Sequence, residues 1–221
     1  VGSEMCIRDS CGGVCGFSRL CGEGEQQMVK ETGFYALLSR MRYISRWGLM
    51  RSSIPENVQE HSHETAVYAH ALGIIRREIF GQECDAERLA VLAVYHDASE
   101  ILTGDLPTPI KYHDRTLRDA YKKVEHAADE RLLAMLPEEL RGAYESAFTA
   151  SEDEEKLVKA ADKLSALRQC IEERKAGNRE FLSAEEQTRR AIEKMHLPEA
   201  DWFMEHCLGA FEKNLDELGT M

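Results

Sequence analysis

From Gly33 to the C-terminus, nearly every segment between glycines and prolines repeats its apolar residues with the period of an α-helix. No stretch alternates apolar and polar residues persuasively enough to predict a β-strand. The pattern therefore predicts an all-α fold, a helical, bundle-like arrangement in a single domain, since no linker is long enough to separate two domains. With 221 residues, the chain can bury a substantial core without disulfide bonds.

Breakers and capping residues divide this pattern into separate helices. Asn57, Asp85 and Ser151 are the expected N-caps, and Ser151 is followed by Glu154 in the spacing of a capping box. Two prolines and a glycine predict a stiff loop over 103–109. The predicted helices cover 34–45, 57–80, 85–102, 114–136, a short segment from 137, 151–177, and two at the C-terminus, the last over 199–218.

The first 27 residues lack this periodicity. Val1–Gln27 is rich in glycine and carries four of the 7 cysteines. We expect residues 1–27 to be a disordered leader that is not native, with Met28 as the natural start and one domain over 28–221. The dispersed, odd set of cysteines is unlike a disulfide framework, and Cys11 and Cys15 lack the second pair that a zinc site needs.

Charge and hydropathy exclude several classes of function. The 28 Lys and Arg against 40 Asp and Glu give a net charge of −12, so we expect no nucleic-acid partner held by general electrostatic attraction. No apolar stretch approaches the roughly 18 residues of a membrane span, and no signal-peptide pattern opens the chain. We therefore expect a cytoplasmic protein with no membrane partner. A small anion in a local pocket remains compatible with this composition.

Three ionisable residues continue the apolar stripe of the predicted helix 85–102. Steps of three and four residues from Leu89 lead to His96, Asp97 and Glu100. A buried, unpaired charge costs several kcal/mol, so such residues are expected only where they are paired or hold a metal ion.

The same anomaly recurs on two other predicted helices. His61 follows Val58 on an inward face, and Asp162 follows Val158 on another. Taken singly, an inward histidine is more often a hydrogen-bonded core residue, and a lone aspartate is more often a cap or a local salt bridge. The adjacent pair His96-Asp97 on a core stripe reverses that preference.

Four of these side chains form a plausible ligand set: His61, His96, Asp97 and Asp162. Two imidazoles and two carboxylates suit one divalent transition-metal ion, Co, Mn, Fe, Ni or Zn, and no thiolate favours a structural zinc site. Mg²⁺ is less favoured, because imidazole adds affinity mainly for transition metals.

A histidine, an adjacent His-Asp pair and a distant aspartate, all on helices, resemble the HD-domain metal-dependent phosphohydrolases. The surrounding segments are similar to the bacterial 5′-deoxynucleotidase family, which removes the 5′-phosphate from deoxyribonucleoside monophosphates, and the resemblance covers Phe34 to Leu218. Gly48 departs from it, because proline is expected there, and the leader matches nothing in the family. The segments that carry the resemblance are Ser45-Arg46-Trp47, Asn57-Val58-Gln59-Glu60-His61-Ser62, Tyr95-His96-Asp97-Ala98-Ser99-Glu100, and Leu102-Thr103-Gly104-Asp105-Leu106-Pro107-Thr108-Pro109.

The resemblance implies roles for individual residues and a homodimer. Arg46 is expected to orient the phosphate, Glu100 to transfer a proton or position water, and Trp47 to shape the sugar pocket, with Asp105 accepting from the 3′-hydroxyl. The four residues named above would be the metal ligands. The expected catalytic residues are Glu100 and Arg46, and the expected substrate-binding residues are Arg46, Trp47, Asp97, Asp105, Leu106, Pro107, Thr108 and Asp162.

Simpler interpretations stay open for three of these residues. Trp47 could simply pack in the core, and Arg46 could interact with the dipole at a helix C-terminus. Asp105 could be a turn residue that accepts hydrogen bonds from neighbouring backbone amides. Two other functions also remain: an HD phosphohydrolase for a cyclic nucleotide or a guanosine alarmone, and a non-catalytic, metal-stabilised interaction module. Glu100 argues against the module, because a structural metal site needs no further inward ionisable group.

Overall fold

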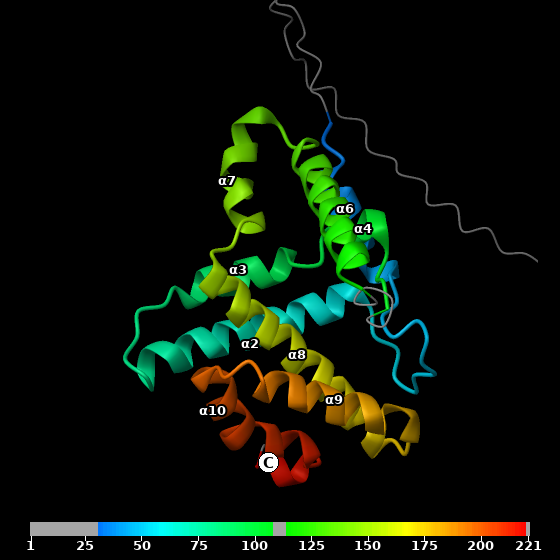
Figure 1. The fold of residues 1–221 in the computed structure, drawn as a ribbon, viewed down its shortest axis with the longest axis vertical. Helices are drawn as coiled ribbons and strands as arrows, with labels where there is room; N and C mark the ends of the chain where they lie inside the picture. Colours follow the sequence, from blue (N-terminus) through cyan, green and yellow to red (C-terminus); the bar gives the residue numbers. More distant parts are fainter. Residues whose placement is uncertain (1–30, 108–113, 220–221) are drawn as a thin grey trace, which may run out of the picture. The chain divides into compact units, whose positions relative to one another are not determined.

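The computed structural model describes residues 31–107 and 114–219, and that part of the chain consists of helices joined by loops (Figure 1). It contains no β-strand, only an isolated bridge between Ser45 and Asn57. The all-α prediction is confirmed. The α-helices are α1 (Phe34–Leu38), α2 (Val58–Glu78), α3 (Ala86–Tyr95), α4 (Glu100–Thr103), α6 (Arg115–Leu133), α7 (Glu138–Phe148), α8 (Glu152–Lys175), α9 (Leu182–Glu193) and α10 (Pro198–His206). Short 3₁₀ helices cover Ser39–Tyr43, Arg179–Phe181, Leu208–Glu212 and Asp216–Leu218.

The predicted leader, residues 1–27, lies outside the described residues, so its disorder and its non-native origin stay predictions. Thr32–Met221 forms one unit of the chain. No helix in the described ranges is both long and apolar enough to cross a membrane.

The predicted N-caps are confirmed. The Asn57 side chain accepts the backbone N–H of Glu60, and Asp85 accepts that of Arg88. Ser151 forms a complete capping box, because Glu154 also accepts the backbone N–H of Ser151. These caps fix where α2, α3 and α8 begin.

The prediction of one continuous helix over 85–102 is wrong. Helix α3 ends at Tyr95, and α4 begins only at Glu100. The His96 ring nitrogen Nδ1 lies 2.7 Å from the Ala93 carbonyl, which the next helical turn would use, and tighter bonds such as Ala98 N to Tyr95 O at 2.9 Å follow. The side chain of His96 therefore ends the helix.

The first and last predicted helices are also shorter than expected. Helix α1 passes into a 3₁₀ turn that ends at Tyr43, because the chain then pairs with the segment before α2, with Arg46 N donating to Glu56 O at 3.0 Å. Helix α10 ends at His206 rather than continuing to 218, and a glycine at 209 disfavours continuation.

In the segment that begins with α10, Phe203 is in the core and Cys207 and Phe211 pack against it, whereas Ala210 is exposed. The three larger side chains of this segment therefore pack in or against the core of the chain.

Helix α2 lies at the centre of the fold and packs against both α3 and α8 (Figure 1). Gly73 permits the close approach to α3, because a Cβ atom there would lie 2.8 Å from the backbone of Ala86. The largest core cluster includes Leu72 of α2, Leu89 of α3 and Leu164 of α8.

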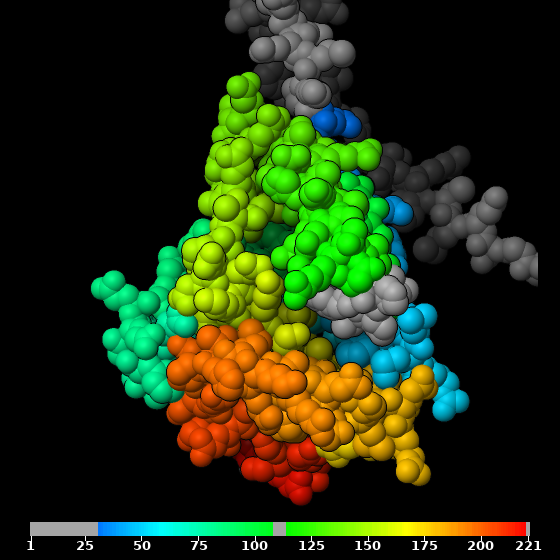
Figure 2. All heavy atoms as spheres, viewed as in Figure 1, coloured from blue at the N-terminus to red at the C-terminus, as the bar shows by residue number. Residues whose placement is uncertain are grey.

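On one face of the molecule, α6 is seen in green above α9 in orange (Figure 2).

A second apolar cluster joins α1 to α6. Phe34 is fully buried there, with Ala98, Leu132 and Leu136. Because Ala98 belongs to the turn between α3 and α4, this cluster also anchors the segment that carries His96 and Asp97.

Candidate metal centre

Three central helices bring the predicted ligands together. His61 lies in the first turn of α2, His96 and Asp97 directly follow α3, and Asp162 lies near the middle of α8. Because α2 packs against both α3 and α8, residues separated by up to 101 positions meet at the same place.

The distances are short enough for a shared ion. His61 Nε2 lies 3.0 Å from Asp162 Oδ1 and 3.6 Å from Asp97 Oδ2, and His96 Nε2 lies 3.1 Å from the same Asp97 oxygen. One donor atom each of His61, His96 and Asp162 lies within 4.8 Å of the others. The structure thus brings all four side chains together, and their role as ligands remains a prediction.

Hydrogen bonds behind the two imidazoles orient their Nε2 atoms toward the carboxylates. His96 Nδ1 faces the Ala93 carbonyl, an acceptor, so this nitrogen carries the proton. Ser165 Oγ donates to Glu64 Oε2 at 2.6 Å, so it accepts from His61 Nδ1 at 3.1 Å. In the neutral imidazoles, both Nε2 atoms are then left with a lone pair, which is the arrangement that metal-binding histidines require.

The charges at the centre perturb one another strongly. Burial by itself lowers the pKa of His96, but Asp97 and Asp162 outweigh it and raise the pKa to about 9. Burial raises the pKa of Asp97, but His96 and then His61 lower it to about 2. The pKa of Asp162 is also well below its usual range, because the His61 hydrogen bond and charge outweigh burial. The site therefore favours positive charge between its carboxylates.

This donor set fits a divalent ion. His96 Nε2 is buried and makes no regular hydrogen bond among the described residues, although Asp97 Oδ2 lies 3.1 Å away. A bound cation would replace the proton on that nitrogen and would be neutralised by two carboxylates.

Arg46 and Trp47 lie beside this centre. Arg46 Nη1 donates to Asp97 Oδ2 at 3.5 Å, so Arg46 pairs with carboxylates instead of acting as a charge at a helix end. Trp47 is half-buried, and its ring meets the edge of Phe181 at a centroid distance of 5.1 Å, so packing is part of its role. Burial opposes the charge on Arg46, but surrounding carboxylates outweigh burial and raise the pKa of the guanidinium. They belong to Asp162, Asp97, Glu56 and Asp105.

The other predicted site residues within the described ranges lie at the start of α4 and in the loop that follows it. Glu100 is buried as the first residue of α4, 5% exposed, after the helix break. Asp105 lies near enough to influence Arg46. Leu106 and Pro107 are half-buried in the loop after α4, and Thr108 lies outside the described residues.

Sequence reasoning missed a group of polar residues behind the ligands. Glu56 lies in a loop, where no periodicity marked it as buried. Ser165 follows Asp162 by three residues on the same face of α8, a position that the helical period reveals, but its hydrogen bond to His61 was not predicted. Arg168 Nη2 donates to Glu64 Oε2 at 2.6 Å and so completes a chain of contacts behind His61.

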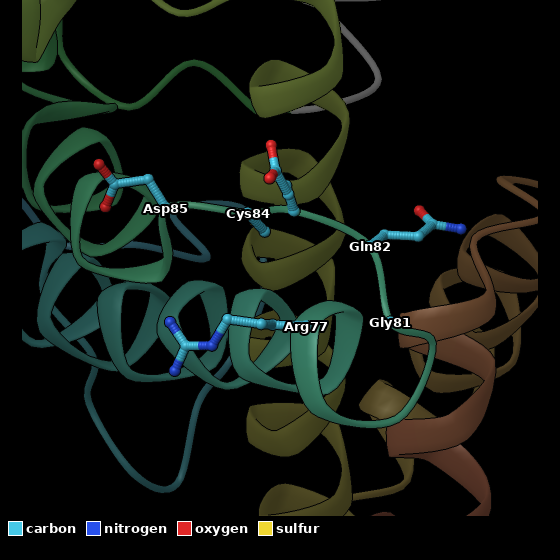
Figure 3. Close-up of a pocket in the computed structure, with 6 residues that line it drawn as sticks. Arg77, Gly81, Gln82, Cys84 and Asp85 are labelled. Atoms are coloured by element: carbon cyan, nitrogen blue, oxygen red, sulfur yellow. The ribbon is translucent and has the colours of Figure 1, made fainter.

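A surface pocket elsewhere has none of these features. It lies at the loop between α2 and α3, where the side chains of Arg77, Gln82 and Asp85 spread in different directions (Figure 3). All three are exposed, and none belongs to the cluster described above. The pocket therefore lacks the buried, convergent polar side chains of a binding or catalytic site.

Solved structures share the fold. A protein from Listeria innocua described as an HD-domain phosphohydrolase matches with a TM-score of 0.71 at 24% identity, covering 85% of this chain and 92% of that one. An HD phosphohydrolase of cyanophage S-2L, described as bound to dA and one catalytic Zn²⁺ ion, matches with a TM-score of 0.59 at 20% identity, covering 81% and 96%. The fold is that of the HD-domain phosphohydrolases.

Sequence comparisons identify the family. The family described as 5′-deoxynucleotidase YfbR-like matches residues 33–211. A 5′-deoxynucleotidase of Vibrio vulnificus is 46% identical over 193 residues, covering 86% of this chain and all of the relative. The 5′-deoxynucleotidase YfbR of Escherichia coli is 46% identical over 195 residues, covering 86% and 97%. This chain belongs to the YfbR-like 5′-deoxynucleotidase family, so the predicted family is confirmed.

Proposed function

We propose that this protein is a metal-dependent 5′-deoxynucleotidase that hydrolyses deoxyribonucleoside 5′-monophosphates to deoxyribonucleosides and phosphate. The main observation behind the proposal is that two imidazole Nε2 atoms and two carboxylates lie close together beside Arg46, in a chain of this family. Relatives at 46% identity that are named 5′-deoxynucleotidases support the substrate class.

The proposed ligands are His61, His96, Asp97 and Asp162, and the proposed cofactor is one divalent ion of Co, Mn, Fe, Ni or Zn. The phage relative of the same fold, described as holding a catalytic Zn²⁺ ion, supports zinc as one of the ions to test. When bound, the ion would polarise a phosphate oxygen and acidify a water molecule.

The side chains around the ion would bind and orient the substrate. Arg46 keeps its positive charge, because neighbouring carboxylates raise its pKa, and its outer N–H groups suit a forked contact with phosphate oxygens. Glu100 is proposed to transfer a proton or position the attacking water, since a buried carboxylate can do this without competition from bulk solvent.

The residues proposed to select deoxyribose over ribose are Trp47, through its indole, and the loop residues Asp105, Leu106, Pro107 and Thr108. A rigid wall that offers the 2′-hydroxyl neither space nor a hydrogen-bond partner would disfavour ribose. Asp105 would accept a hydrogen bond from the 3′-hydroxyl.

We further propose a homodimer in the cytoplasm, which the family resemblance implies, with no nucleic-acid or membrane partner. The net charge of −12 supports the last point for nucleic acids.

The test is phosphate release from a panel of deoxyribo- and ribonucleoside 5′-monophosphates. The protein is stripped of metal and refilled with Co²⁺, Mn²⁺, Zn²⁺ or Mg²⁺ in turn. Release from dAMP but little from AMP supports the proposal. Hydrolysis of only cyclic nucleotides or guanosine alarmones would reject it in favour of a related phosphohydrolase. Loss of folding after chelation, with no activity restored by any ion, would favour a non-catalytic module.

A further inference from the structure

Glu56 is a buried carboxylate to which the proposed reaction gives no role. It lies in the loop before α2, and its side chain is only 3% exposed. A buried carboxylate is costly unless charges and hydrogen bonds compensate it, so its partners indicate what it does.

Those partners are the two residues proposed to bind phosphate and sugar. Glu56 Oε2 accepts from Trp47 Nε1 at 2.7 Å and from Arg46 Nε at 3.2 Å. The other oxygen, Oε1, lies 3.7 Å from Arg168 Nη2 and 3.9 Å from His61 Nδ1. A single carboxylate oxygen therefore joins the two neighbouring side chains.

The backbone shows that this arrangement is held against a local preference. Trp47 has φ of 61°, a left-handed conformation that costs a residue other than glycine of order 1 kcal/mol or more. It is held by the bond to Glu56, by the contact with Phe181, and by the backbone bond from Arg46 N to Glu56 O at 3.0 Å.

The contact also directs the guanidinium. While Nε of Arg46 donates to Glu56, the outer nitrogen Nη1 lies on the side of the metal centre, 3.5 Å from Asp97 Oδ2. The planar guanidinium cannot turn away without breaking the bond to Glu56.

We propose that Glu56 is a positioning residue that couples phosphate binding by Arg46 to sugar selection by Trp47. The inference rests on the proposed function and adds a residue that holds the two side chains proposed to bind the phosphate and select the sugar. Glu56 acts through its two partners and does not touch the reacting atoms.

The first test follows the indole itself and needs no substrate. The chain has 2 tryptophans, so in a Trp202→Phe background fluorescence reports on Trp47 alone. Glu56→Gln keeps the side-chain shape but removes the charge, and should shift the emission of Trp47 and increase its quenching by acrylamide. Glu60→Gln, an exposed carboxylate four residues later, is the matched control and should change neither.

The second test is kinetic. Glu56→Gln should lower kcat/KM for dAMP about 10- to 100-fold, the loss expected for a hydrogen bond to a charged group, and narrow the preference for dAMP over AMP. Metal content per chain, measured at saturating metal, should stay at the wild-type level. In a Trp47→Phe background, which lacks the indole N–H, Glu56→Gln should change the dAMP-to-AMP ratio little further.

The outcomes separate the two proposals. If the wild type releases no phosphate from dAMP, the proposed function is wrong and there is no sugar selection for Glu56 to support. If the wild type is active and Glu56→Gln keeps its fluorescence, its kcat/KM and its dAMP-to-AMP ratio, only the role of Glu56 is overturned. Equal effects of Glu56→Gln on the ratio with and without the indole N–H would also overturn it.

Discussion

Ser165→Ala tests whether the hydrogen bond behind His61 strengthens the binding of the metal ion. The Ser165 hydroxyl accepts from His61 Nδ1 at 3.1 Å, and the ring is fully buried. The next acceptor facing Nδ1, Glu56 Oε1, lies 3.9 Å away, beyond hydrogen-bond distance. The variant therefore leaves a buried N–H without an acceptor whenever Nε2 binds the ion.

The expected cost falls on the metal-loaded state. Without the ion, His61 can place its proton on Nε2 and donate to Asp162 Oδ1 at 3.0 Å. Glu64 also keeps a partner, because Arg168 still donates to it. Only the loaded protein then suffers the roughly 1–3 kcal/mol of an unsatisfied buried donor, which corresponds to a metal Kd about 10- to 100-fold higher.

The assay is a competition titration of Zn²⁺ or Co²⁺ between the protein and a chromophoric chelator. Ser62→Ala is the matched control, because Ser62 is a buried serine one residue from His61 whose Oγ has no hydrogen-bond partner in the described part of the chain. An unchanged Kd in Ser165→Ala, or an equal loss in both variants, would refute the reasoning.

The other predictions concern the ligand set, the chemistry and the stability of the fold. Asp97→Ala should abolish metal binding, measured as ions per chain, and phosphate release, because it removes an oxygen that lies within 3.6 Å of both imidazoles; retained activity would contradict the ligand assignment. Glu100→Gln should keep the metal but lower kcat by about 10²- to 10⁴-fold, and normal turnover would exclude Glu100 from the mechanism. Arg76→Met leaves the buried carboxylate of Glu199, 1% exposed, without its cation, and should lower the free energy of unfolding by about 3–5 kcal/mol, measured by chemical denaturation. Adding Glu199→Leu to the same chain should restore most of that free energy. An unaltered denaturation midpoint in the single variant would disprove the expectation. Gly48→Ala should raise the free energy of unfolding by about 0.4–1 kcal/mol, because its Cβ would meet nothing within 4 Å; a loss of stability would count against this.

Much of the fold was predictable from local chemistry. Side-chain caps at Asn57, Asp85 and Ser151 act within one helical turn, so the sequence alone locates the starts of their helices. The break at His96 was not predictable, because apolar periodicity does not reveal a ring nitrogen that captures the carbonyl of Ala93.

In the candidate site, too, residues marked by a local sequence pattern were predictable, and residues placed by contacts between distant segments were not. His61 and Asp162 were detectable because each interrupts an apolar face, and periodicity is a local signal. Glu56 was not, because its burial depends on a pairing between two loop segments that no pattern within either segment announces.

The placement of the ligands on α2, after α3 and on α8 ties metal binding to the folding of the whole chain. Residues 61, 96 and 162 meet only after most of the chain has folded, so a partly folded molecule has no site to offer. An ion that binds only the native state adds to its stability, by about 2.7 kcal/mol at a free concentration 100 times the Kd. The melting temperature of this protein should therefore rise with the concentration of free metal, which makes thermal shift a direct readout of the ion that the site prefers.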